Sequence, residues 1–354
     1  MTGCPARYDE ELGYWVVDDP ALAREVLLDP ETFRPDNAVL AHTPLSVKAL
    51  RVLSGVGFAL PPTLANNAGV SHRPIRAAVA RFFSPARVTA VEPLARELTA
   101  ARVAEATKVV ERDGQVDLVQ AVAAEPPALV VLDMLGLTEV DVPALKAWSL
   151  DSLELFWGWP DEDRQLELAH SAAEFYAWLR SRTTAARQAP GDDLFGVLVA
   201  LGLTDEEVCA VGYFLLIAGQ ETTAQLISTT FHHTLLAGGD PAAVVEDVLR
   251  EASSVPTWRR VTAGPAVVGG VELPGGAPVL LGLSGHGGPA DLAFGVGVHR
   301  CLGAGLARME ARVALECAAG LLSAVRLVEE PPMIDLLSFR APKRLMVTSV
   351  RNAE

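Results

Sequence analysis

The segment that decides the fold is Phe294-Gly-Val-Gly-Val-His-Arg-Cys301-Leu-Gly303. Its two glycines, Gly295 and Gly297, predict a tight loop in which the backbone closely approaches another group. Cys301 stands at the end of this loop, directly before an apolar pattern typical of a long helix. A thiolate there gains from the helix N-terminal field and from backbone N–H donors, which also suit a thiolate that binds iron. The alternative is a glycine-rich turn around a buried structural cysteine.

Outside this loop, the composition is that of a globular protein. The chain has 354 residues, of which 50% are hydrophobic, many of them Ala, Leu and Val, which favours helices and a sizeable core. No linker or repeat divides residues 1–354, so we expect a single domain of the mainly α class with small β-sheets. The net charge of −15 argues against nucleic acid as a partner. No apolar run of about 18 residues predicts a membrane span and no secretory signal is visible, so we expect a cytoplasmic protein.

The order of the expected elements follows from the apolar spacing and from Pro and Gly breaks. Helices dominate from residue 71 to 239, after a short strand, a helix that begins at Pro20 and a stretch of irregular loops. The longest helix, 204–236, is apolar on nearly every side in its middle, which is typical of the centre of a domain. The remaining expectations are strands at 14–17, 325–328 and 344–350, helices at 241–253 and 302–323, and a small β region at 261–281.

The four cysteines, Cys4, Cys209, Cys301 and Cys317, contain no CxxC pair and no closely spaced metal cluster. In a cytosolic chain we expect them to be thiols. Cys209 and Cys317 lie in apolar helical stretches, which is typical of small core residues, and Cys4 is expected to be inert.

A second motif, Ala218-Gly-Gln-Glu221-Thr222-Thr223, places polar groups in the most apolar part of the chain. Glycine inside a helix costs about 1 kcal/mol relative to alanine, and a buried acid costs more unless it is used or paired. A hydroxyl can bond to a carbonyl one turn back and let a water enter the helix. The motif therefore predicts polar chemistry in the core, and a kinked helix with satisfied threonines is the alternative.

A third motif, Ser71-His72-Arg73-Pro-Ile-Arg76, opens an expected helix. His72 and Arg76 stand four residues apart and share one helix face, where two cationic donors suit a pair of carboxylates. Taken alone, this motif favours a solvated basic face.

Together the three motifs resemble the cytochrome P450 family. The first is similar to the family's haem-binding loop, Phe-x-x-Gly-x-x-x-Cys-x-Gly, and the second to its Ala-Gly-x-Glu/Asp-Thr signature. The resemblance implies a cytochrome P450 fold and haem b (iron protoporphyrin IX), with Cys301 as the axial ligand of the metal and Phe294 packed near the sulfur. It also implies that Glu221 and Thr222 are the catalytic acid–alcohol pair, which relays protons during dioxygen activation.

The resemblance further assigns donors to the haem propionates. The third motif matches the family's His-x-x-x-Arg helix, and a further donor is expected just before the β region, either Arg260 or its neighbour Arg259. The cofactor-binding residues that the resemblance implies come from the cysteine loop and from cationic side chains elsewhere: His72, Arg76, Arg260, Phe294, Gly295, His299, Cys301 and Gly303.

The chain departs from the family pattern on the proximal side, where haem is supported from behind. The family's Glu-x-x-Arg is Asp247-Val-Leu-Arg250 here, and Glu246 could also pair with Arg250. The stretch between Pro274 and Phe294 lacks most of the segment in which the family carries Asn-Arg-Asp-Pro, and the link 232–240 is short. We therefore expect a fold truncated around the proximal meander region.

These features predict a haem-thiolate monooxygenase that hydroxylates, epoxidises or couples a small apolar molecule in secondary metabolism, with electrons from a ferredoxin and its reductase. An atypical haem enzyme for a cyclisation, a dehydration or a peroxide-driven step is the alternative, and a haem-poor scaffold protein is the third. The substrate is expected to contact the central helix before Ala218, the loop 61–70 and the aromatic stretch 155–160.

Overall fold

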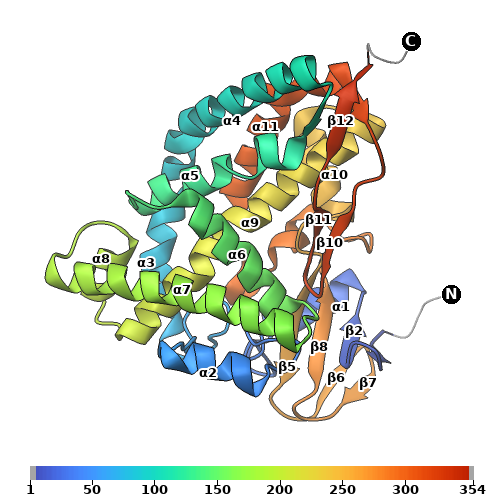
Figure 1. The fold of residues 1–354 in the computed structure, drawn as a ribbon. Helices are drawn as coiled ribbons and strands as arrows, with labels where there is room; N and C mark the ends of the chain where they lie inside the picture. The colour runs from blue at the N-terminus through green and yellow to red at the C-terminus, as the bar shows by residue number, and fades with distance from the viewer. Residues whose placement is uncertain (1–4, 351–354) are drawn as a thin grey trace.

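Long helices form most of the protein and cross around one central helix, α9 (Figure 1). The computed structural model describes residues 5–350, so Cys4 and its expected inert thiol lie outside the described residues. The mainly α class with small sheets is confirmed. The helices are α1 (Pro20–Leu28), α2 (Val47–Gly55), α3 (His72–Ala80), α4 (Pro85–Asp113), α5 (Pro126–Leu135), α6 (Val142–Trp157), α7 (Glu162–Gln188), α8 (Leu194–Ala200), α9 (Asp205–Ala237), α10 (Pro241–Glu251) and α11 (Ala304–Ala324), with shorter turns η1 (Arg81–Phe83), η2 (Val119–Ala123), η3 (Ala290–Phe294) and η4 (Gly297–His299).

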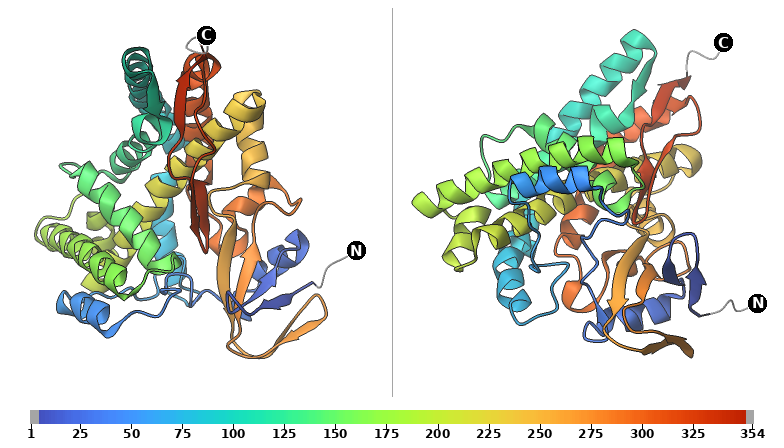
Figure 2. Two further views of the ribbon diagram at one scale, coloured as in Figure 1. Left: turned by 45° about the vertical axis from the view of Figure 1, so that its right-hand side comes forward. Right: turned by 60° about the horizontal axis from the view of Figure 1, so that its bottom comes forward.

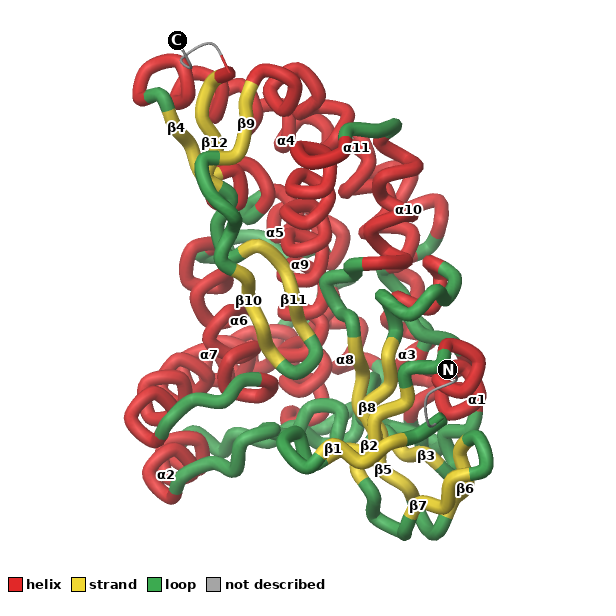
Figure 3. Tube along the Cα trace, turned by 90° about the vertical axis from the view of Figure 1, so that its right-hand side faces the viewer, coloured by secondary structure: helices red, strands yellow, loops and turns green. Residues whose placement is uncertain are grey.

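The strands form four small sheets on one side of the helical body (Figure 3). The largest has the order β1-β2-β8-β5-β3 and is antiparallel except where β2 runs parallel to β8. The others are β4-β12-β9, β10-β11 and β6-β7. The strands are β1 (Arg7–Asp9), β2 (Tyr14–Val17), β3 (Phe33–Arg34), β4 (Gln115–Asp117), β5 (Thr257–Thr262), β6 (Ala266–Val268), β7 (Val271–Leu273), β8 (Pro278–Gly282), β9 (Val325–Leu327), β10 (Met333–Leu336), β11 (Phe339–Pro342) and β12 (Met346–Ser349).

The central helix begins where its cap predicts. The Thr204 side chain accepts from the Glu207 N–H, and the Glu207 carboxylate accepts from the Thr204 N–H, so α9 starts with a complete capping box. From Val208 to Phe231 most of its side chains are buried, because α5, α6, α7, α10 and α11 all pack on it. The predicted place of this helix at the centre of the molecule is confirmed.

Several strands were not expected from the sequence. The hairpin β10–β11 is absent from the prediction, because its strands pair with each other and show no long apolar alternation. The β region predicted at 261–281 begins earlier, at Thr257. In Figure 2, the blue helix α2 lies alongside α7. Within residues 5–350, no helix is both long and apolar enough to cross a membrane.

Candidate active site

A cavity of about 240 Å³ lies between α9 and the cysteine loop, residues 294–303. Its wall is mostly apolar and aromatic, and residues of all three sequence motifs contribute to it. Thr222 stands on the α9 side and Cys301 on the loop side. The tertiary structure thus brings together two motifs that are about 80 residues apart in the sequence.

Cys301 opens into this cavity as a free, accessible thiol. Burial raises the pKa of its thiol, while the backbone N–H groups of Gly303 and Ala304, which bond to the sulfur, and the nearby Arg76 lower it. The Cys301 N–H donates to the Phe294 carbonyl at 2.8 Å, which closes the loop. A sulfur that faces a cavity and is held by N–H donors is arranged to ligate a metal as a thiolate.

The two loop glycines adopt backbone conformations that favour glycine. Gly295 has a φ of +65° and Gly297 a φ of +74°. A Cβ atom on Gly297 would lie 3.2 Å from the Leu27 carbonyl oxygen of α1. The predicted close approach of the backbone is therefore to α1, which packs against the loop from outside.

Three of the predicted propionate donors line the cavity: Arg76, Arg260 and His299. Arg260 is 1% exposed, its Nε has no partner, and burial lowers the pKa of its guanidinium to about 10. Arg259 instead donates to the carbonyls of Ala38 and Leu40 and lies over the ring of Trp157. Between the two neighbours, the structure therefore favours Arg260 as the residue that faces the site.

His299 and His72 lie side by side, with ring centroids 4.9 Å apart. The Nε2 of His299 bonds to the Asn67 carbonyl at 2.8 Å, and its Nδ1 is buried without a partner. Burial lowers the pKa of His299 to about 4. His72 is buried behind the wall, also with an unpartnered Nε2, and Arg76 donates to the Arg300 carbonyl beside the cysteine.

These residues fit a haem. An unpaired buried donor is costly. The unpartnered nitrogens of Arg260 and His299 belong to residues that line the cavity, and the unpartnered Nε2 of His72 belongs to the ring beside His299, behind the wall. A flat apolar macrocycle with two carboxylates would suit this apolar wall, with its carboxylates toward those groups. The cysteine sulfur at the loop side would hold the iron of such a group.

The predicted acid–alcohol pair is held by separate partners. Glu221 is 2% exposed, and its carboxylate binds Lys146 of α6 at 2.5 Å. Burial raises the pKa of Glu221, and Lys146 opposes that rise. The Thr222 hydroxyl donates to the Ala218 carbonyl at 2.8 Å and lines the cavity, whereas Glu221 lies behind it.

Two residues of this site were missed by sequence reasoning. Lys146 gives no local signal, because its partner is 75 residues away. Ser254 donates to the Thr222 carbonyl at 2.9 Å from the loop between α10 and β5, and it also lines the cavity. Only the tertiary contacts reveal either residue.

On the proximal side, the alternative pairing of Glu246 with Arg250 is wrong. Arg250 pairs with Asp247 at 2.8 Å, and both side chains are more than 40% exposed. Glu246 instead accepts from Arg308 of α11 at 2.6 Å. Glu246 pairs with Arg308 and not with Arg250 because the Arg308 guanidinium, on the facing helix, can bond to both of its carboxylate oxygens.

The predicted substrate contacts all contribute to the cavity wall, though unevenly. The central helix supplies Tyr213, Phe214 and Ile217 before Ala218, and the loop supplies residues up to Asn66. From the stretch 155–160, Phe156 and Trp157 line the cavity, while Trp159 is half-exposed elsewhere.

Several known proteins are similar to this chain over most of its length. No protein-family model matches the chain. Erythromycin C-12 hydroxylase of Saccharopolyspora erythraea is 31% identical, over 87% of this chain and 82% of that relative. Cytochrome P450 monooxygenase PikC of Streptomyces venezuelae is 30% identical, over 85% of this chain and 76% of its own length.

The same likeness holds in three dimensions. The solved structure of cytochrome P450 CREJ in complex with (4-ethylphenyl) dihydrogen phosphate matches with a TM-score of 0.89 and 28% identity. The match covers 98% of this chain and 94% of that one. The fold expected from the cysteine loop is thereby confirmed.

Proposed function

Because this chain belongs to the cytochrome P450 family, we propose that Cys301 holds the iron of haem b and that the cavity above it receives the substrate. The chain is a haem-thiolate monooxygenase, like the hydroxylases and the epoxidase among its relatives. The observation that carries the proposal is the Cys301 thiol, which receives two backbone N–H groups and opens into an apolar cavity.

The side chains of this protein divide the work between binding and proton transfer. Haem, when bound through a thiolate, supplies dioxygen activation and the transfer of one oxygen atom. Arg76, Arg260 and His299 would hold its carboxylates, since all three line the cavity and the Nε of Arg260 and the Nδ1 of His299 are buried without a partner. The apolar wall excludes water, which strengthens each of these polar contacts.

Protons reach the cavity through the polar residues Glu221 and Thr222 of α9. Thr222 lines the cavity, and its hydroxyl can exchange its bond to the Ala218 carbonyl for one to a water. Glu221 holds a proton or passes it on, because burial raises its pKa while Lys146 keeps part of its charge compensated.

The substrate is a small, largely apolar molecule. Apart from the three groups assigned to haem and the loop residue Arg300, no charged side chain lines the cavity within the described residues. Aromatic rings from Phe156, Trp157, Tyr213 and Trp258 form much of the wall, which favours a substrate with flat or ring-shaped apolar parts. Relatives such as the erythromycin C-12 hydroxylase support a role in secondary metabolism.

Electrons come from a separate redox partner, and a ferredoxin with its reductase is the donor that we propose. We further propose that residues 1–354 act as one domain and that the protein works in the cytoplasm. Reduction of the purified protein by a ferredoxin and its reductase tests the proposed electron donor directly.

The thiolate assignment is tested by spectroscopy. The purified protein, reduced and exposed to carbon monoxide, gives the red-shifted Soret band that is typical of thiolate-ligated haem. Cys301→Ala, reconstituted with haem, loses that band. The matched control is Cys317→Ala, which removes a half-buried thiol outside the cavity wall and keeps the band. A parent protein that takes up no haem would sink the proposal.

A further inference from the structure

The cysteine loop needs a support that its own sequence does not supply. It runs between η3 and α11, and its two glycines have positive φ angles. Because glycine allows many backbone conformations, the loop does not fix its own shape. Within it, the Cys301 N–H bonds to the Phe294 carbonyl at 2.8 Å. The position of the sulfur therefore follows the position of Phe294 at the end of η3.

Arg308, in the second turn of α11, contacts three structures around that point. Its Nε and Nη2 reach the two carboxylate oxygens of Glu246 on α10, at 2.6 and 3.1 Å. Its Nη2 also reaches Asp291 of η3 at 2.9 Å. The guanidinium carbon lies 4.7 Å from the ring centroid of Phe294.

This arrangement is more than a single ion pair, and the side chains of its two acids, Glu246 and Asp291, are 42% and 64% exposed. The contact to Glu246 is bidentate, the Arg308 side chain is 25% exposed, and its bond to Glu246 raises the pKa of Arg308. A cation over an aromatic ring adds a further attraction that fixes the ring plane. Asp291 also faces Arg300, 3.7 Å away in the cysteine loop, so one chain of charges joins α10, α11, η3 and the loop.

The family's usual pair does not occupy this place. Asp247 and Arg250 pair with each other at the surface, and the segment between Pro274 and Phe294 is short. We propose that Arg308 is the positioning residue that holds Phe294, and through it the Cys301 thiolate. The inference rests on the proposed function, since it concerns how Cys301 is presented to haem.

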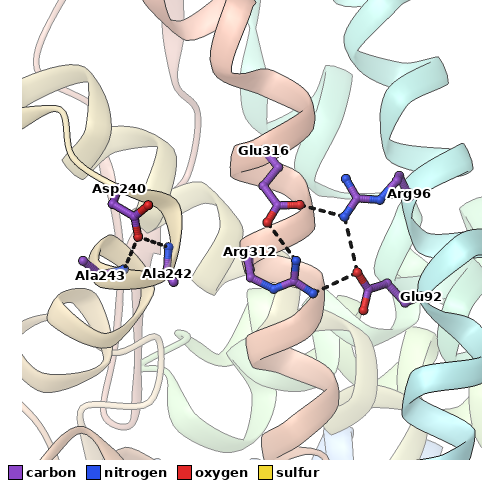
Figure 4. Close-up of polar contacts among 7 residues, drawn as sticks. All are labelled: Glu92, Arg96, Asp240, Ala242, Ala243, Arg312 and Glu316. Carbon is purple, nitrogen blue, oxygen red and sulfur yellow. Dashed lines mark hydrogen bonds and ion pairs between the residues drawn. The ribbon is translucent and has the colours of Figure 1, made fainter.

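The test compares Arg308→Met and Arg308→Lys with a neighbouring arginine. Arg312, one turn further along α11, belongs to a separate four-membered network with Glu92, Arg96 and Glu316 (Figure 4). Arg312→Met therefore removes a charge of the same kind from the same helix without touching Phe294. The readouts are the share of the reduced carbon monoxide complex in the thiolate form and the reduction potential.

We expect Arg308→Met to lose about half or more of the thiolate form. Without Arg308 the cysteine loop can shift by a fraction of an ångström, and the Cys301 sulfur is then no longer held where it can bind iron. Arg308→Lys should retain part of the thiolate form, since lysine keeps the positive charge but cannot make the two parallel hydrogen bonds to Glu246. Arg312→Met should match the parent in both readouts.

A second variant keeps the test valid if Arg308→Met fails to fold. Asp291 is exposed, so Asp291→Asn is expected to fold and to weaken only the link to η3, with a smaller shift in the same direction. If both Arg308→Met and Asp291→Asn keep the parent's thiolate share and potential, the positioning role is wrong. A parent without the thiolate band would instead overturn the proposed function itself, so the two failures are distinguishable.

Discussion

At the scale of single residues, the acid of the central helix depends on a lysine from another helix. Glu221 is almost fully buried, and Lys146 is its charged partner at 2.5 Å. Lys146→Met leaves the acid unpaired, and breaking a buried pair from one side costs on the order of 3 kcal/mol. We expect a lower free energy of unfolding in urea and a pKa of Glu221 that moves further upward.

The matched control for this prediction is Lys108→Met, because the Lys108 side chain is 70% exposed and its ion pair lies at the surface. That variant should unfold at the parent's urea concentration. Equal free energies of unfolding of Lys146→Met and Lys108→Met would contradict the stabilising role of Lys146.

A second residue-scale prediction concerns Glu310 of α11. It is 3% exposed, and neither of its carboxylate oxygens has a partner. Burial raises its pKa well above the usual value, so the folded protein keeps a proton that the unfolded chain releases. This contribution to stability is complete below the ordinary carboxyl pKa of about 4.3 and is lost as the pH rises toward the raised value, by up to about 1.4 kcal/mol per pH unit.

Glu310→Gln removes that pH dependence, because the amide does not titrate. Urea unfolding over a series from mildly acidic to mildly alkaline pH should show the variant gaining on the parent as the pH rises. Glu105→Gln, at an exposed position of α4, serves as the control. A constant difference between Glu310→Gln and the parent across the series would contradict the assignment.

At the scale of elements, the glycine of the α9 motif sets the distance between two helices. A Cβ atom on Gly219 would lie 2.8 Å from a methyl group of Val131 on α5, and Val131 is fully buried. Alanine would gain about 1 kcal/mol in helix propensity, but overpacking costs about 1–3 kcal/mol. We expect Gly219→Ala to destabilise the protein by about 1 kcal/mol in urea unfolding.

A double-mutant cycle separates the two effects. In a Val131→Ala background the clash is removed, so Gly219→Ala should become stabilising. The same loss in both backgrounds would show that the glycine serves backbone geometry and not helix spacing.

Some helices of the molecule follow from local sequence patterns, whereas some short strands do not. The capping box at Thr204 and the apolar turns of α9 and α11 are local signals, and these helices lie where expected. The hairpin β10–β11 was missed because its four-residue strands depend on each other and on packing against α9. Short strands carry little pattern of their own.

At the scale of the whole molecule, the fold and its cavity predict an oxygen-dependent reaction. Removal of dioxygen should abolish product formation with a ferredoxin system. Thr222→Ala should divert reducing equivalents from product to peroxide or water, because it removes the hydroxyl of a residue that lines the cavity. The measurement is the ratio of product to reductant consumed. Product formed equally well without oxygen would support the alternative of an atypical haem enzyme.

The sequence by itself determined the family, the thiolate candidate and the helical class. These follow from residues close together in the chain: the spacing from Phe294 to Cys301, the acid and alcohol at 221–222, and the apolar period of the helices. The tertiary structure decided which neighbour faces the cavity, Arg260 and not Arg259, and which charges meet across helices, as Lys146 with Glu221. It also placed Glu246 on Arg308 and left Asp247 at the surface. The physical reason is that backbone patterns are local, whereas ion pairs and cavity walls depend on side-chain directions from segments far apart in the chain.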